Sequence, residues 1–96
     1  MHARVTTYQI DPAHKNEVDK VLSELTGKIK SLPGILSSNT VWRDDGCGIS
    51  MSIYDCKASA IEAATQLDQI WASFSNILAE KPTTEVYDYT RDLLAR

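Results

Sequence analysis

Ninety-six residues of ordinary globular composition leave room for one small folded domain. The chain carries ten Lys and Arg residues against thirteen Asp and Glu residues, a net charge of −3, and so lacks the basic surface on which binders of nucleic acids and anionic membranes rely. We therefore expect a single domain over residues 1–96, with a core at about 3–90 and a short tail at 91–96, and no nucleic-acid or membrane partner.

The sequence also favours a reducing compartment. No stretch is apolar over the length of a signal-peptide core or a membrane-spanning helix. Cys47 and Cys56 lie near opposite ends of one expected strand, which separates their Cα atoms by about 30 Å, whereas a disulfide needs about 4.4–6.8 Å. We expect two free thiols and a cytoplasmic protein.

The first half of the chain predicts a strand followed by a helix. Residues Ala3 to Ile10 are rich in β-branched and aromatic side chains that alternate in type. Asp11-Pro12 then supplies an N-cap and a proline at the first helical position, and the helix is expected from about Pro12 to Leu32. Its apolar residues recur at helical spacing: Val18, Val21, Leu22, Leu25, Ile29 and Leu32.

A hairpin is expected next. Pro33-Gly34 ends the helix, and two extended stretches follow, Ile35 to Arg43 and Gly48 to Tyr54. Asp45-Gly46 between them is a hairpin signal, because such a turn needs a positive φ that glycine adopts without strain.

The last third predicts a second helix and a fourth strand. Asp55 is a suitable cap, and Lys81-Pro82 marks the end of the helix. Thr83 to Thr90 reads as the final strand. The apolar stripe of the helix is formed by Ala60, Ala64, Leu67, Trp71, Phe74 and Leu78.

This βαββαβ order predicts an α+β, ferredoxin-like domain in which both helices cover one face of a four-stranded antiparallel sheet. We expect the helix-covered face to carry Val5, Ile49, Met51 and Ile53. The opposite face would then carry Tyr8, Ile10, Leu36, Trp42 and Tyr54. Because so large an apolar patch is seldom left in water, we expect a homodimer with the two sheets face to face and an interface formed by Tyr8, Ile10, Leu36 and Trp42.

With these elements in place, the chain resembles the antibiotic biosynthesis monooxygenase-like branch of the dimeric α+β barrel superfamily from about Val5 to Tyr89. The resemblance rests on the element order, on Leu32-Pro33-Gly34-Ile35, on Asp45-Gly46, and on Ile53-Tyr54-Asp55-Cys56-Lys57-Ala58 before an alanine-rich helix. It implies an apolar pocket between sheet and helices in which an electron-rich aromatic molecule meets oxygen without a cofactor.

Candidate site residues follow from that resemblance. Trp71, Asn76 and Tyr54 are candidate catalytic residues that would orient a small apolar or aromatic ligand and stabilise its anion by hydrogen bonds. The competing interpretation of Trp71 and Phe74 is plain core packing, since aromatic residues at helical spacing usually lie in the core.

Other chemistries find little support. The haem-degrading branch uses an asparagine on the first strand and a histidine on the second helix, whereas this chain has Thr6 and Thr7 on the strand and no histidine beyond His14. His14 itself is expected at the surface, before the apolar stripe of its helix begins. Two distant histidines and two distant cysteines match no metal-site spacing, so we expect neither metal nor cofactor.

Rival uses of the scaffold also fail. An RNA-recognition domain needs stacking aromatics where this chain has Gly46 to Met51, and a metal chaperone needs a Cys-x-x-Cys loop where it has Asp11 to His14. Three functions remain open: a cofactor-independent monooxygenase acting on a small aromatic or quinol-like substrate, a non-catalytic ligand-binding or stress-associated dimer, and an isomerase.

Overall fold

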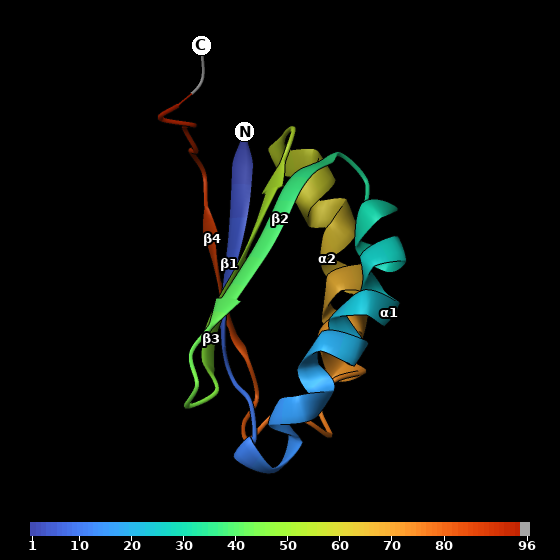
Figure 1. Cartoon of the computed structure of the whole chain (residues 1–96). Helices are drawn as coiled ribbons and strands as arrows, with labels where there is room; N and C mark the ends of the chain where they lie inside the picture. The colour runs from blue at the N-terminus through green and yellow to red at the C-terminus, as the bar shows by residue number, and fades with distance from the viewer. Residues whose placement is uncertain (95–96) are drawn as a thin grey trace.

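A computed structural model describes residues 1–94 and has two helices packed on one face of a four-stranded antiparallel sheet (Figure 1). In chain order the elements are β1 (His2–Gln9), a 3₁₀ helix η1 (Pro12–Glu17), α1 (Val18–Lys30), β2 (Ile35–Trp42), β3 (Cys47–Tyr54), α2 (Lys57–Ala72) and β4 (Thr83–Tyr87). The strand order in the sheet is β2-β3-β1-β4. The predicted ferredoxin-like α+β fold is thereby confirmed.

The first helical region is divided in two, where the sequence predicts one helix. The Asp11 carboxylate accepts a hydrogen bond from the Ala13 amide at 3.0 Å, as expected of an N-cap. The His14 amide donates to the Asp11 carbonyl at 2.8 Å, an i to i+3 bond that tightens the chain into the 3₁₀ helix η1. Regular α-helix begins only at Val18.

The second α-helix ends at Ala72, and the prediction that it continues to Lys81 is wrong. Ser73 is the C-cap, and its hydroxyl donates to the Ile70 carbonyl at 2.6 Å. Side chains of this kind compete with helical hydrogen bonds, and three turns closed by i to i+3 bonds follow, with the amides of Phe74, Ser75 and Ile77 as donors. Phe74 and Ile77 in these turns are still buried, so the apolar stripe continues beyond the end of the helix.

The start of the second α-helix also differs from the prediction. The helix begins at Lys57 with Cys56 as its N-cap, so the predicted capping role of Asp55 is wrong.

The hairpin is formed as predicted. Gly46 has a φ of 87°, and the Cys47 amide donates to the Asp45 carboxylate at 2.9 Å. The Arg43 amide closes the turn on the Cys47 carbonyl at 2.9 Å. Both cysteines are free, as expected.

The two faces of the sheet are the reverse of the prediction. Directly paired residues project to the same side, and the pairs run Thr40 to Ser50 to Thr6 on the side that the helices cover. The opposite side, here called the outer sheet face, carries Ala3, Val5, Thr7, Ser37, Asn39, Val41, Ile49, Met51, Ile53, Thr83, Glu85 and Tyr87. Alternation alone shows that a strand has two faces and does not show which one the helices cover.

The expected interface residues therefore lie elsewhere. Tyr8 and Ile10 are buried under the helices in this chain's own core, so their predicted exposure is wrong. Trp42 pairs with Gly48, which also pairs with Tyr8, and so it projects to the helix side near the end of β2. Leu36 lies in a β-bulge between Ile35 and Ser37, where the register shifts, and is 57% exposed beside a cavity that it helps to line.

The core consists of two clusters rather than one continuous layer. The smaller contains Tyr8, Ile10 and Val18. The larger contains Leu25, Leu32, Tyr54, Ala60, Ala63, Leu67, Ile70, Phe74 and Ile77. Between them, Ser and Thr side chains form the centre of the helix-facing side of the sheet. A polar sheet centre beneath apolar helices is the feature that positions the candidate site.

The C-terminal end is shorter in strand structure than predicted. β4 stops at Tyr87 where the sequence predicts Thr90, and Tyr89, Leu93 and Leu94 are exposed. Residues 95 and 96 of the expected tail lie outside the described residues. Over residues 1–94, neither helix combines the length and apolar character needed to cross a bilayer.

Candidate functional site

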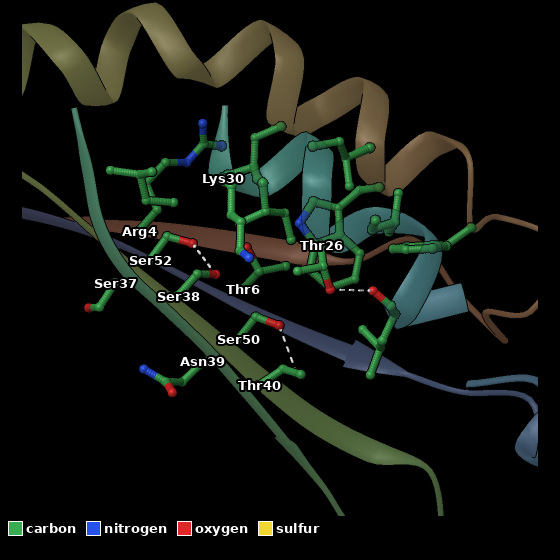
Figure 2. Close-up of a pocket in the computed structure, with 18 of the residues that line it drawn as sticks. Arg4, Thr6, Thr26, Lys30, Ser37, Ser38, Asn39, Thr40, Ser50 and Ser52 are labelled. Atoms are coloured by element: carbon green, nitrogen blue, oxygen red, sulfur yellow. Dashed lines mark hydrogen bonds between the residues drawn. The ribbon is translucent and has the colours of Figure 1, made fainter. Parts of the chain in front are cut away.

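A cavity of about 480 Å³ lies between the helix-facing side of the sheet and the helices α1 and α2 (Figure 2). Its volume is in the range of small-molecule binding sites. The helices supply an apolar wall, whereas the three strands β1, β2 and β3 supply a floor of hydroxyl groups. The apolar wall is formed by Leu22, Leu25, Ile29, Leu67, Ile70, Trp71 and Phe74.

Trp71 is the largest side chain in this wall. Its ring lies 5.2 Å from the Tyr8 ring and 6.0 Å from the Phe74 ring, measured between centroids, with the second pair edge to face. Both separations are typical of stabilising aromatic pairs. Trp71 is only partly buried, so part of its ring surface remains available to a ligand. The two interpretations of Trp71 therefore coincide, because it packs against the core and lines the cavity.

The Thr40 and Ser50 hydroxyls of the cavity floor belong to a hydrogen-bonded chain that ends at Tyr8, which is not among the described lining residues. The Tyr8 hydroxyl and the Thr40 hydroxyl are 2.5 Å apart, and the Ser50 hydroxyl donates to Thr40 at 2.9 Å. Figure 2 shows Ser50 and Thr40 side by side on neighbouring strands, joined by this bond. Burial raises the pKa of Tyr8, and its hydrogen bonds to Thr40 and Ser50 offset part of that rise. The raised pKa keeps the Tyr8 hydroxyl neutral at physiological pH.

Glycine at position 48 makes room for Tyr8 in this arrangement. The two residues pair across β1 and β3, and a Cβ at position 48 would lie 2.4 Å from Tyr8 Cζ and 2.6 Å from its hydroxyl oxygen. The absence of a side chain leaves room for the Tyr8 ring at Gly48, and Trp71 packs against the same ring. The position of the hydroxyl chain therefore depends on Gly48.

Arg4 closes the floor near the start of β2. It pairs with Ser52 across the sheet, and Ser52 in turn hydrogen bonds Ser38 at 3.1 Å. The Arg4 side chain is only 10% exposed, and one of its terminal nitrogens lies 3.5 Å from the Asp68 carboxylate. Its Nε atom is buried and has no hydrogen-bond partner. A buried, incompletely paired guanidinium facing a cavity is an unusual and costly arrangement.

The predicted catalytic residues do not converge. Trp71 lines the cavity, but Asn76 is exposed in the turns after α2 and is not part of its wall. Tyr54 is fully buried in the larger core cluster, and its hydroxyl has no partner. Burial raises the pKa of Tyr54, with the positive charge of Arg4 acting in the opposite direction. Of the three residues, Trp71 lines the cavity, and Asn76 and Tyr54 are not among its described lining residues.

The polar residues of the floor are not predicted from the sequence, because the prediction places the opposite face of the sheet under the helices. A signal was present in the sequence. Arg4, Thr6 and Tyr8 share one parity on the first strand, and Ser50 and Ser52 share one on the third. An assignment that put these polar positions under the helices would have predicted a cavity, since a solid core would not place hydroxyls there.

The cavity contains few groups capable of metal binding or base catalysis. Within residues 1–94, no three His, Cys, Asp or Glu side chains lie close enough to hold a metal ion. The described lining of the cavity contains none of these four residue types. His14 contacts Glu17 within η1 and is not among the described lining residues. The chemistry that this site offers is hydrogen bonding, apolar enclosure and positive charge.

Comparison with known proteins gives structural matches only. No protein-family model matches the sequence, and no curated protein matches it. A crystal structure described as an antibiotic biosynthesis monooxygenase superposes with a TM-score of 0.73 at 18% identity, covering 95% of this chain and 100% of that one.

Two further structures carry more specific descriptions. A monooxygenase from the gene ActVA-Orf6 of Streptomyces coelicolor, in complex with nanaomycin D, has a TM-score of 0.72 at 17% identity, with 99% of this chain and 92% of that chain covered. SnoaB, a cofactor-independent oxygenase from Streptomyces nogalater, has a TM-score of 0.72 at 12% identity, with coverage of 98% and 97%. The chain therefore has the ferredoxin-like fold of structures described as antibiotic biosynthesis monooxygenases.

Proposed function

We propose that this protein is a homodimeric, cofactor-independent monooxygenase acting on a small aromatic or quinol-like substrate. The observation that carries the proposal is the cavity itself, where Trp71 provides an aromatic surface and Thr40 and Ser50 provide hydroxyl groups. Two structures of the same fold support it, one described as a monooxygenase and the other as a cofactor-independent oxygenase.

The reaction class needs little from the protein beyond binding and electrostatics. For an anthrone-like substrate, a ring CH₂ group loses a proton, and the resulting anion gives electrons to O₂. A C–O bond forms, the O–O bond breaks, and the CH₂ group becomes a carbonyl while the second oxygen atom leaves as water. The substrate is the reductant and O₂ the oxidant. The floor hydroxyls would donate hydrogen bonds to the oxyanion that develops on the substrate.

The homodimer is proposed from the outer sheet face. Its exposed apolar side chains include Val41 at 66%, Ile49 at 47%, Met51 at 40% and Tyr87 at 47%. No helix covers this side of the sheet in the described chain (Figure 1). Twofold pairing of the same face in two copies removes this area from water.

A cytoplasmic location is proposed because both cysteines are free thiols, which suit a reducing compartment.

A second candidate, a non-catalytic ligand-binding protein, is favoured by one observation. The described cavity lining contains no His, Cys, Asp or Glu that would act as a general base. Both candidate functions place the ligand in the same cavity, and they differ in whether the bound ligand is converted to a product.

Oxygen uptake decides between them. Purified, metal-free protein is mixed with a panel of hydroquinones and anthrone-like phenols in an oxygen electrode, with a protein-free control for autoxidation. We expect uptake above the control, its loss in Trp71→Ala, and its retention in Asn76→Ala, which changes an exposed residue. Binding of the panel without uptake would support the ligand-binding candidate, and product formation without oxygen would support an isomerase.

A further inference from the structure

The charge inside the cavity is opposite to that of the whole chain. The chain has a net charge of −3, yet the described charged residues in the cavity lining are two cations, Arg4 and Lys30. The other lining residues are apolar or carry hydroxyl or amide groups. An anionic ligand would therefore meet attraction from the cavity lining and no acidic side chain in it.

The two cations lie at the same end of the cavity. Lys30 is the last residue of α1, and the chain turns from there directly into β2 at Ile35. Ile35 pairs with Tyr54, and Arg4 pairs with Ser52 on the same strand, two positions away. Figure 2 draws Arg4 and Lys30 in the same part of the view, with Ser50 and Thr40 below them.

Arg4 has bonding capacity that this chain does not use. Its side chain is 10% exposed, whereas that of its partner Asp68 is 72% exposed and 3.5 Å away. The Nε atom is buried without a partner. A guanidinium donates N–H groups in a planar fork that matches the two oxygens of a carboxylate, and such bonds are stronger than neutral ones.

We propose that the cavity binds an aromatic molecule bearing a carboxylate, with the carboxylate against Arg4, assisted by Lys30, and the ring against Trp71. This rests on the proposed function, whose substrate class it narrows to acidic aromatics. The apolar wall of the cavity accepts the aromatic ring, while Arg4 and Lys30 fix the orientation of the ligand.

The test compares two ligands of the same shape by isothermal titration calorimetry at neutral pH: 2-naphthoate, and its uncharged analogue 2-naphthamide. We expect wild-type protein to bind the naphthoate at least about tenfold more tightly, as a charge-assisted bond in a partly dry site predicts. Arg4→Met should abolish this preference while naphthamide binding persists. Lys30→Met should reduce it.

Lys28→Met is the matched control, because Lys28 is an exposed cation on the same helix that is not among the described lining residues of the cavity. The Lys28→Met variant should prefer naphthoate over naphthamide by the same factor as the wild type. Equal affinity of wild-type protein for the two ligands would overturn the proposed anion site and leave the apolar pocket intact. A preference for naphthoate over naphthamide that persists in a folded Arg4→Met variant would also overturn the proposed anion site. Absence of binding for both ligands would refute the pocket as well.

Discussion

Gly48→Ala should destabilise the protein through Tyr8 alone. The backbone at Gly48 is not the obstacle, because only Gly34 and Gly46 among the glycines have positive φ. The added methyl carbon would lie 2.4 Å from Tyr8 Cζ, 2.5 Å from Cε2 and 2.6 Å from the hydroxyl oxygen. Tyr8 has little room to retreat, since it is 8% exposed and Trp71 packs against it.

The magnitude follows from two effects. Overpacking a buried site costs about 1–3 kcal/mol. Displacement of the Tyr8 ring also breaks its hydrogen bond to Thr40, which contributes about 1 kcal/mol. We therefore expect Gly48→Ala to lower the free energy of unfolding by about 2–4 kcal/mol in urea denaturation followed by circular dichroism, at equal protein concentrations.

Two controls isolate the cause. Gly27→Ala adds the same methyl group where nothing lies within 4 Å, in α1, and should stabilise the protein by about 1 kcal/mol. In a Tyr8→Ala background the obstructing ring is gone, so Gly48→Ala should cost less than about 0.5 kcal/mol. A loss below about 1 kcal/mol in the wild-type background, or an undiminished loss in the Tyr8→Ala background, would refute this account of Gly48.

Two further perturbations test the hydroxyl chain and the outer sheet face. Burial raises the pKa of Tyr8 above that of an unfolded tyrosine, so its contribution to stability is fully present below pH ~10 and is lost as pH rises through the higher folded value. Urea titrations from neutral to strongly basic pH should show a smaller loss of stability in Tyr8→Phe than in wild type, and equal losses would contradict the assignment. Met51→Glu places a charge at the centre of the outer sheet face and should weaken the proposed homodimer by about 100-fold or more in sedimentation. Ile61→Glu, on an exposed position of α2, should leave the dimer unchanged, and a dimer of undiminished affinity in Met51→Glu would exclude this face as the interface.

Most of the fold could be predicted from local patterns in the sequence. Asp11-Pro12 and Asp45-Gly46 act within a few residues of themselves, and both perform the predicted role. Helix ends were less predictable. The end of α2 at Ala72 depends on Ser73 bonding back to Ile70, a competition between side chain and backbone that the apolar stripe does not reveal.

The site was less predictable because it depends on which face of the sheet the helices cover. The prediction placed Ile49 and Met51 under the helices on the rule that apolar residues face the core. The structure places Ser50 and Ser52 there, and leaves the apolar residues on the outer sheet face. The apolar face of an alternating strand can be buried by the helices of its own chain or by another copy of the chain. The alternating pattern in the sequence is the same in both cases.

The central claim, that the cavity between sheet and helices is the ligand site, is tested most directly by NMR of protein labelled at the isoleucine δ1-methyl groups and titrated with 2-naphthol. Three isoleucines, Ile29, Ile35 and Ile70, line the cavity, whereas Ile49 and Ile53 lie on the outer sheet face. We expect saturable chemical-shift changes at Ile29, Ile35 and Ile70, with Ile49, Ile53 and the exposed Ile61 unaffected. Changes confined to Ile49 and Ile53, or no saturable change at Ile29, Ile35 and Ile70, would contradict it.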